Sequence, residues 1–436
     1  MTYSTELPVG PVVSHLESVE TPDDRTVVMR LNTRFAPFGF YASSAPIVPK
    51  HLWQSVNPAE FQNTDPVGTG PFKFAAYTPG EGVWLEANTS YWDEPPDIEL
   101  LQFLIVPDSN KRVSGLLNGS WDAAGDIPEA SVNELTTSQD VEVLIVRPWV
   151  TNWLGFNLRK FPMNLPAFRQ AVDLAVDKQR IFEEAALSIG DPGNDGYMPP
   201  VLSQWLDPGS PYWGGPNWSA ARLSSEERYA RANALLDEIL GTLRDNDGVR
   251  IAPDGTRLDF ELHLGAELPR PARIAEIISD NLQQLGIRIR PNVKAQRRVE
   301  QLVFEEANFD MYLMGNNYWP DPDFLFFEWF SDPPIPSWNA EAEGYVNPEL
   351  NAVLLAQRQT VDPAQRLELA QQAQRILAED LPVVVTLHSG AIQAFRMDRF
   401  EGWDLQEGIY STRTTRNIRG RSLPETSPRS QTEDGR

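Results

Sequence analysis

The feature that most constrains the fold is an alternation of helical and strand-like patterns through the middle of the chain. Apolar residues recur at helical spacing over residues 167–181 and again over 274–285. The runs 258–264 and 287–290 are short, apolar or alternating, and bounded by turn residues, as strands are. This alternation predicts an α/β fold for the middle of the chain.

Two helices carry clear start signals. Ser224 is a good N-cap, and Glu227 three residues later completes a capping box. Asp362 is a second N-cap, with Gln365 as its partner one turn on. An apolar strand over 381–387 follows that last helix, so the end of the chain repeats the helix–strand order.

The first part of the chain is richer in strands and turns. Residues 16–20 and 25–31 predict a β-hairpin around a Thr-Pro-Asp-Asp turn. Strands over 72–77 and 83–87 flank a Pro-Gly-Glu-Gly turn in the same way, and 109–118 predicts a helix. We therefore expect a β-rich first part with short helices.

Composition excludes several classes of protein. The net charge of -24, from 61 acidic and 37 basic residues, repels phosphate backbones, so we expect no nucleic-acid partner. Cysteine is absent, which removes disulfides and thiolate chemistry. No run approaches the ~18 apolar residues that cross a bilayer, and the first residues lack the basic and apolar regions of a signal peptide.

Motifs for metals, phosphates and catalysis are all incomplete. The four histidines lack metal-ligand spacing. Asp245-Asn-Asp-Gly248 fails as a calcium loop because Thr256 stands where that loop needs glutamate. Gly68-Thr-Gly70 is not followed by the lysine of a phosphate loop. We predict no metal, no cofactor and no catalytic residue.

Neighbouring carboxylates leave one enzymatic alternative open. Asp321 with Asp323, or Glu305 with Glu306, are candidates for the acid pair of a glycoside hydrolase. Separation in space, and not adjacency in sequence, identifies such a pair. Turn or solvated carboxylates are therefore the favoured interpretation.

Tryptophan is concentrated between residues 149 and 338, and several lie in Gly, Pro or Asn contexts. Loops of that composition lie at the surface or line a cleft. An aromatic ring beside amide side chains suits a ligand with an apolar face and hydroxyl or amide edges, such as a peptide or a sugar.

Five motifs occur together in an order and spacing typical of one family. They are Asn63-Thr-Asp-Pro-Val-Gly-Thr-Gly-Pro-Phe-Lys-Phe74, Asn88-Thr-Ser-Tyr-Trp92, Leu117-Asn-Gly-Ser-Trp-Asp-Ala123, Phe168-Arg-Gln-Ala-Val-Asp-Leu-Ala-Val-Asp177 and Trp319-Pro-Asp-Pro-Asp-Phe-Leu325. By these motifs the chain resembles the family 5 extracellular solute-binding proteins of ABC importers, over about residues 12–420. That family includes binders of peptides, nickel, opines and oligosaccharides.

The resemblance implies a large two-lobed α/β fold of the periplasmic-binding-protein type, with an accessory subdomain. On that basis residues 1–65 belong to the accessory subdomain, 66–147 with 386–423 form the first lobe, and 148–385 form the second. Residues 424–436 are polar and rich in Pro and Ser, and we predict a disordered tail.

The chain departs from the family pattern in two ways. It begins after the export or lipoprotein signal and the early first-lobe segments, so we expect an incomplete first lobe with unpaired edge strands. Where peptide binders place an acid that pairs with the ligand's amine, this chain has Tyr318, followed by Trp319. Losing a charge-assisted hydrogen bond there would cost about 1.5–3 kcal/mol, which leaves an oligosaccharide as an alternative ligand.

The resemblance implies a non-enzymatic, monomeric receptor in the periplasm or outside the cell, associated with the membrane. It would capture an oligopeptide or similar small polar solute between two lobes and deliver it to an ABC permease; an oligosaccharide receptor and a glycoside hydrolase are the alternatives. We expect stacking by Trp149 and Trp319 and hydrogen bonding by Asn152, Asn317 and Tyr318. The full candidate set for ligand binding is Trp149, Thr151, Asn152, Trp153, Asn316, Asn317, Tyr318 and Trp319.

Overall fold

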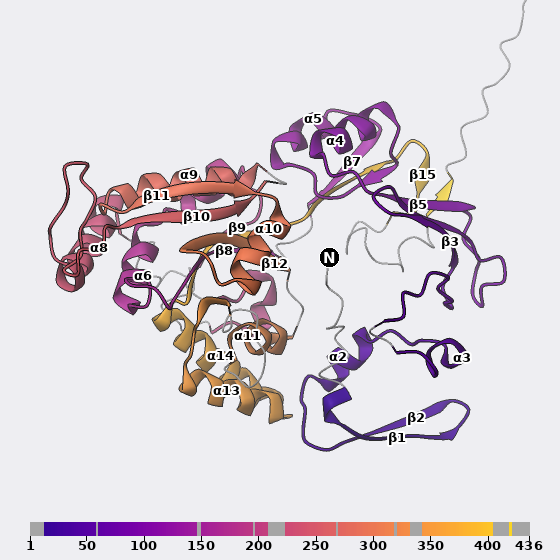
Figure 1. Cartoon of the computed structure of the whole chain (residues 1–436). Coiled ribbons are helices and arrows are strands. Elements are labelled where there is room, and N and C mark those ends of the chain that lie inside the picture. The colour runs from indigo at the N-terminus through magenta and orange to yellow at the C-terminus, as the bar shows by residue number, and fades with distance from the viewer. Residues whose placement is uncertain are drawn as a thin grey trace, which may run out of the picture. The chain divides into compact units, whose positions relative to one another are not determined.

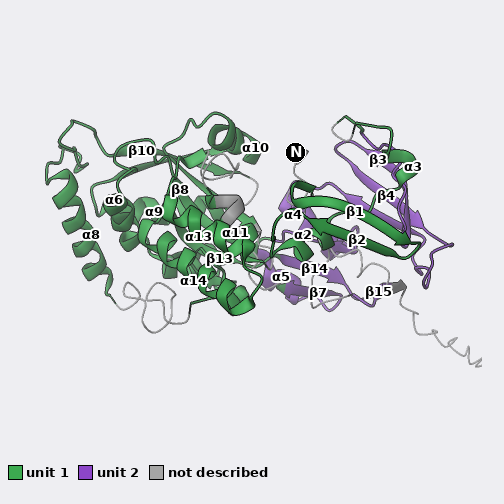
Figure 2. Cartoon of the chain, turned by 90° about the horizontal axis from the view of Figure 1, so that it is seen from below, with its two compact units in different colours: residues 1–61, 128–130, 145–391 green, residues 62–127, 131–144, 392–436 purple. Residues whose placement is uncertain are grey.

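The computed structural model divides the chain into two compact units, which Figure 2 distinguishes by colour. Unit 1 comprises residues 1–61, 128–130 and 145–391, and unit 2 comprises 62–127, 131–144 and 392–436. The structure describes residues 13–57, 60–145, 150–194, 197–207, 223–266, 269–317, 321–331, 342–403 and 418–420. Across those ranges, no helix combines the length and apolarity needed to cross a membrane.

Unit 1 is built around a six-stranded mixed sheet with the order β11-β10-β12-β8-β13-β9. β10 runs parallel to both β11 and β12, whereas β8 is antiparallel to its neighbours β12 and β13. The strands are β8 Val150–Phe156, β9 Asp191–Pro192, β10 Asp259–Gly265, β11 Arg288–Lys294, β12 Met311–Asn317 and β13 Val383–Ser389. In Figure 1 these strands lie with α9 on one side and α13 and α14 on the other.

Helices cover both faces of this sheet. They are α6 Pro166–Ala175, α7 Lys178–Arg180, α8 Ser225–Leu240, α9 Arg270–Gln283, α10 Gln296–Glu300, α11 Pro322–Phe330, α13 Pro348–Gln359 and α14 Pro363–Asp380. Short 3-10 and π-helical segments add η2 Ile181–Ala185, η3 Pro200–Trp205 and η5 Gln301–Glu305. Burial on both faces explains the apolar sequence of β13, all of whose residues are buried.

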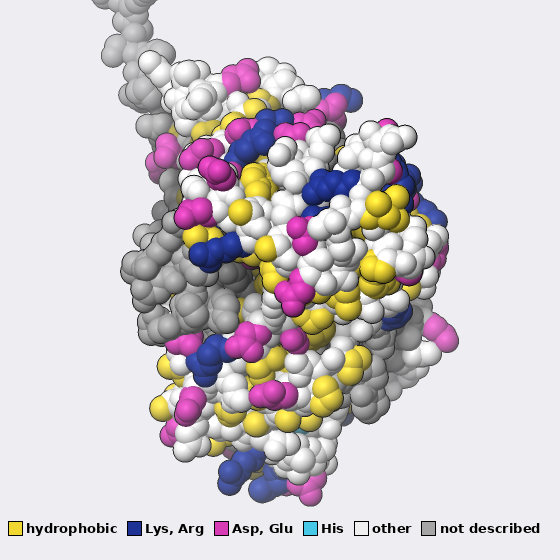
Figure 3. Space-filling view, turned by 90° about the vertical axis from the view of Figure 1, so that its left-hand side faces the viewer, with side chains coloured by type: hydrophobic (Ala, Val, Ile, Leu, Met, Phe, Trp, Pro, Cys, Tyr) yellow, Lys and Arg dark blue, Asp and Glu magenta, His cyan; other side chains and the backbone are white. Residues whose placement is uncertain are grey.

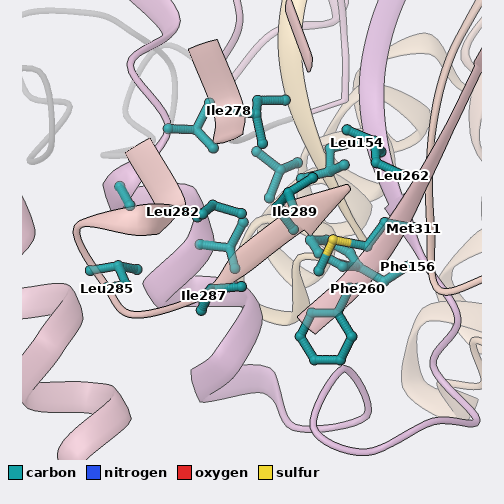
Figure 4. Close-up of a cluster of buried hydrophobic side chains, with 14 of the residues drawn as sticks. Leu154, Phe156, Phe260, Leu262, Ile278, Leu282, Leu285, Ile287, Ile289 and Met311 are labelled. Carbon is teal, nitrogen blue, oxygen red and sulfur yellow. The ribbon is translucent and has the colours of Figure 1, made fainter. Parts of the chain in front are cut away.

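Successive side chains along a strand point to opposite faces of the sheet and pack into two separate cores. Leu154 and Phe156 of β8 join α6, α8 and α9 in the first core, part of which Figure 4 shows. Trp153, which directly precedes Leu154, joins α13 and α14 in the second core. β12 divides in the same way, with Met311 in the first core and Tyr312 in the second. The period of two along a strand therefore fixes which core each residue enters.

Local signals placed the starts of α8 and α14 correctly. The predicted capping box of α8 is present, because Glu227 N donates to Ser224 Oγ and the Glu227 carboxylate accepts from Ser224 N. Asp362 Oδ1 accepts from Gln365 N at 2.9 Å and so caps α14. Each such cap stabilises its helix by about 1 kcal/mol.

Several predicted boundaries differ from those of the structure, and two of the differences have a clear physical reason. The helix predicted over 167–181 ends at Ala175, because Asp177 caps the next turn through Arg180 N and its own amide donates to Asn281. The strand predicted from residue 381 begins at 383, because Leu381 adopts a φ of 44° and closes α14.

Residues near the N-terminus belong to unit 1. β1 Leu16–Asp23 and β2 Thr26–Leu31 form an antiparallel hairpin, followed by α2 Phe38–Ser44 and α3 Lys50–Trp53. The hydroxyl of Tyr41 donates to Asp323 at 3.0 Å, which fastens α2 to α11. Residues 1–61 thus share a compact unit with 145–391, and a separate accessory subdomain over 1–65 stays a prediction.

Unit 2 contains several small sheets. β3 Phe72–Thr78, β4 Gly82–Ala87 and β5 Leu100–Leu104 form one, and β6 Ala123–Ala124, β14 Ile392–Arg396 and β7 Val141–Ile145 form another. Unit 2 also contains helices α4 Ser109–Asn118 and α5 Val132–Thr136 and the pair β15 Phe400–Glu401 and β16 Arg419–Gly420. The segment η1 Glu129–Ser131 is divided between the units, because residues 128–130 belong to unit 1. Arg396 of β14 donates to Leu116 O at 2.8 Å, so the returning chain is fastened to α4.

Acidic side chains do not form one continuous patch on the face that Figure 3 shows. Lys and Arg side chains are interspersed there with Asp and Glu. The described residues also include exposed pairs of opposite charge, such as Arg30 with Glu20 at 3.0 Å. Exposed pairs of this kind are each worth about 0–1 kcal/mol.

Candidate functional site

The candidate site is the carboxyl edge of the unit 1 sheet, which we define as the last residues of β10, β11, β12 and β13 with the first residues of β8. The strand directions bring these ends together, because β8 runs opposite to β12 and β13. Ligands of open α/β sheets bind beyond the carboxyl ends of the strands. This edge is therefore where the topology favours a binding site.

The two sequence segments predicted to bind ligand meet at this edge. Val150 pairs with Asn317, Thr151 with Asn316, and Asn152 with Gly315, so the start of β8 lies beside the end of β12. Trp149, Tyr318 and Trp319 lie outside the described residues, as does the side chain of Asn317. The predicted role of each of these eight residues in binding stays a prediction.

Thr151 and Trp153 are completely buried at this edge. The Thr151 hydroxyl is hydrogen bonded to Nδ1 of His388, its partner on β13. The indole of Trp153 donates to the hydroxyl of Tyr312 at 3.2 Å within the second core. In this structure both side chains hold β8 against its neighbours and present no surface of their own.

Asn152 and Asn316 are the half-buried members of the set. Asn152 Nδ2 donates to Ser389 Oγ at 2.9 Å and to Leu387 O at 3.3 Å, both on β13. The main-chain oxygen of Asn152 accepts from Thr386 at 3.0 Å. Its side chain is thus oriented across the β8–β13 pair.

Trp153, Tyr312 and Glu343 form a chain of buried hydrogen bonds in the second core. Tyr312 accepts from Trp153 and donates to Glu343 Oε1 at 2.6 Å. Burial raises the pKa of Glu343 to about 8, although the Tyr312 hydrogen bond and the charges of Arg169 and Arg159 act in the opposite direction. Glu343 is therefore largely a neutral acid at pH 7.

His388 is a residue that sequence reasoning assigned no role. It is completely buried, and burial together with the charge of Lys178 lowers its pKa to about 3, so the imidazole is neutral. Lys178 itself is buried and pairs with Asp173 at 2.7 Å. The available signal was a histidine that directly follows the apolar run 381–387.

The carboxylates considered for glycoside hydrolysis are held by arginines. Arg366 binds Asp321 through two nitrogens, at 2.7 and 2.9 Å. Asp323 is fully buried and accepts from Arg358 Nε at 2.9 and 3.1 Å. Carboxylates engaged in this way are structural, because each is already neutralised by a buried cation. Of the other pair, exposed Glu306 binds Arg298.

Two of the described histidines, His15 and His263, have packing contacts. Within the described ranges, no three His, Asp or Glu side chains gather in a way that could hold an ion. His15 stacks on Phe35, with ring centroids 4.0 Å apart, and His263 is buried in β10. Both have packing roles.

Comparison with known proteins identifies the family. The profile of the bacterial extracellular solute-binding proteins, family 5 Middle, matches residues 3–337. The peptide transport periplasmic protein SapA of Salmonella typhimurium is 25% identical over 396 residues, covering 88% of this chain and 66% of SapA. The chain spans about two thirds of the length of the curated relatives that it matches.

Solved structures share the fold. NikZ of Campylobacter jejuni, in complex with Ni(L-His), superposes with a TM-score of 0.82 at 21% identity, covering 94% of this chain and 80% of NikZ. AppA of Bacillus subtilis, in complex with a nonapeptide, gives 0.79 at 21% identity, covering 97% and 82%. The predicted α/β fold class and family are confirmed. The chain belongs to the family 5 bacterial extracellular solute-binding proteins.

Proposed function

We propose that this chain captures an oligopeptide, or a similar small polar solute, and delivers it unchanged to an ABC permease. The observation that carries the proposal is that the start of β8 and the end of β12 lie side by side at the carboxyl edge. Half-buried Asn152 and Asn316 supply amide groups there, which suit the amide edges of a peptide. A relative named for peptide transport supports the same ligand class.

The protein works as a receptor without chemistry on its ligand, as a monomer in the periplasm or outside the cell and associated with the membrane. The buried arginine pairs of Asp321 and Asp323 support this role, because they engage one of the two carboxylate pairs considered for glycoside hydrolysis. A neutral oligosaccharide is the alternative ligand, because Tyr318 stands where peptide binders carry an acid and Trp319 replaces the tyrosine that follows that acid.

A thermal-shift screen followed by calorimetry tests the proposal on the whole chain. The panel holds alanine peptides of several lengths, neutral oligosaccharides and the nickel–histidine complex. We expect peptides to raise the melting temperature and to bind with a measurable enthalpy, and the recovered peptide to be intact by mass spectrometry. Binding of sugars alone would overturn the peptide assignment, and cleavage of any bound sugar would overturn the receptor role.

A further inference from the structure

In the side-chain amide of Asn152, the nitrogen and the oxygen differ in their hydrogen bonding to the described residues. Its Nδ2 is held by Ser389 Oγ and Leu387 O. Among the residues that the structure describes, none donates a hydrogen bond to Oδ1. Because a main-chain carbonyl only accepts, the nitrogen must face Leu387, and the orientation of the amide follows from the chemistry of its partner.

The open oxygen lies over a position without a side chain. A Cβ atom added to Gly315, the partner of Asn152 on β12, would lie 2.8 Å from Oδ1 and 3.1 Å from Val150 Cγ1. The φ of Gly315 is not in the left-handed region, so backbone conformation does not call for glycine there. The glycine instead leaves room beside the oxygen.

We infer that Asn152 Oδ1 accepts a hydrogen bond from a backbone amide N–H of the bound peptide, with Ser389 and Gly315 as positioning residues. The inference rests on the proposed function and specifies its chemistry. Asn152 is half-buried at the carboxyl edge, so a bound solute completes its burial. An acceptor that is buried without a donor is costly, and a site built around one rejects ligands that lack the donor. Ser389 is itself 1% exposed, which holds its hydroxyl in place.

The test combines variants of the whole chain with a methylation scan of the ligand. Alanine tripeptide and pentapeptide are compared with the same peptides methylated at one amide nitrogen at a time, with affinities measured by calorimetry. In the wild type, methylation at one position lowers affinity by about tenfold, the worth of one hydrogen bond. In Asn152→Ala the unmethylated peptide is about tenfold weaker, and that methylation has no further effect.

Two further variants separate positioning from folding. Gly315→Ala places a methyl beside Oδ1 and lowers peptide affinity by about tenfold or more. Gly39→Ala is its matched control, because nothing lies within 4 Å of the added Cβ, and it binds as the wild type does. Ser389→Ala reduces the sensitivity to methylation at the same position. Melting curves verify that each variant is folded.

The outcomes distinguish the inference from the proposed function. If the wild type binds the alanine peptides but Asn152→Ala shows the same methylation pattern, the inference fails and the peptide receptor stands. Equal affinities of Gly315→Ala and Gly39→Ala would overturn it as well. If the wild type binds only oligosaccharide or nickel–histidine, the proposed function fails, and the inference fails with it.

Discussion

The buried carboxyl group of Glu343 makes the stability of the chain depend on pH in a direction that can be worked out. It is completely buried, and its pKa in the folded protein is about 8, against 4.5 for an ordinary glutamate. The folded chain therefore keeps this proton between those two values, whereas the unfolded chain releases it. The stabilising contribution is complete below pH 4.5 and is lost as the pH rises towards 8.

The magnitude follows from linkage. Each pH unit in that window lowers the free energy of unfolding by about 1.4 kcal/mol through this one group. Over the whole window the loss amounts to roughly 5 kcal/mol, which is a large fraction of the stability of a typical domain. Above about pH 8 both states are ionised and the slope from Glu343 disappears.

Glu343→Gln removes the titration and keeps the acceptor for Tyr312. The amide oxygen takes the hydrogen bond that Oε1 accepts at 2.6 Å, and the side chain stays neutral at every pH. Urea unfolding, followed by tryptophan fluorescence from pH 5 to pH 9, measures the difference between the two proteins. We expect similar stabilities at pH 5 and an advantage for the variant of several kcal/mol at pH 9.

Tyr312→Phe provides a second test with a different signature. Its hydroxyl stabilises the ionised form of Glu343, so its loss raises the pKa further and extends the sloping region to higher pH. Parallel stability curves for the wild type and Glu343→Gln across the whole range would show that the reasoning is wrong. They would mean that the carboxyl is solvated or paired in the folded protein.

Three other perturbations probe the core and its buried ions. Arg366→Leu leaves the Asp321 carboxylate buried without its cation and should cost about 3–5 kcal/mol in chemical denaturation, whereas Arg30→Leu in an exposed pair should cost less than about 1 kcal/mol. Leu282→Ala, at a fully buried position of α9, should lower stability by about 2–5 kcal/mol, and a loss below 1 kcal/mol would contradict the assigned core. The pKa of His388 is depressed from 6.5 to about 3, so its contribution is present above pH 6.5 and is lost as the pH falls. His388→Asn should therefore flatten acid unfolding by about 1.4 kcal/mol per pH unit between those values.

Sequence reasoning succeeded where the signal is local. The caps at Ser224 and Asp362 depend on side chains within one turn of the helix start, so residue types three positions apart suffice to predict them. The break after Ala175 was missed because it depends on Asn281, which binds the amide of Asp177 from α9. These two residues are 104 positions apart, and the periodicity of neither segment indicates that they are in contact.

The same limit applied to the buried charges. Asp321 and Asp323 were considered as catalytic carboxylates from their motif alone, but their partners Arg366 and Arg358 lie one or two helices later. The charge on each residue was visible in the sequence, and the pairing was not. Only the packing of α13 and α14 against α11 brings these ions together.

Neighbouring residues at the start of β8 differ in burial, and we therefore expect them to differ in function. Thr151 and Trp153 were predicted as ligand contacts with Asn152, but both side chains have no exposed surface, whereas Asn152 is half-buried. Alternation along β8 explains part of the difference, because Trp153 enters the second core and Leu154 the first. Substitution of Trp153 should therefore lower stability. Any loss of binding in that variant would result from unfolding. Substitution of Asn152 removes its two hydrogen bonds to β13 and should cost about 1–3 kcal/mol of stability, less than the loss of the Trp153 side chain at about 3–5 kcal/mol. It should also lower the affinity of the folded protein, so comparing these adjacent positions shows whether this edge of the sheet binds the solute.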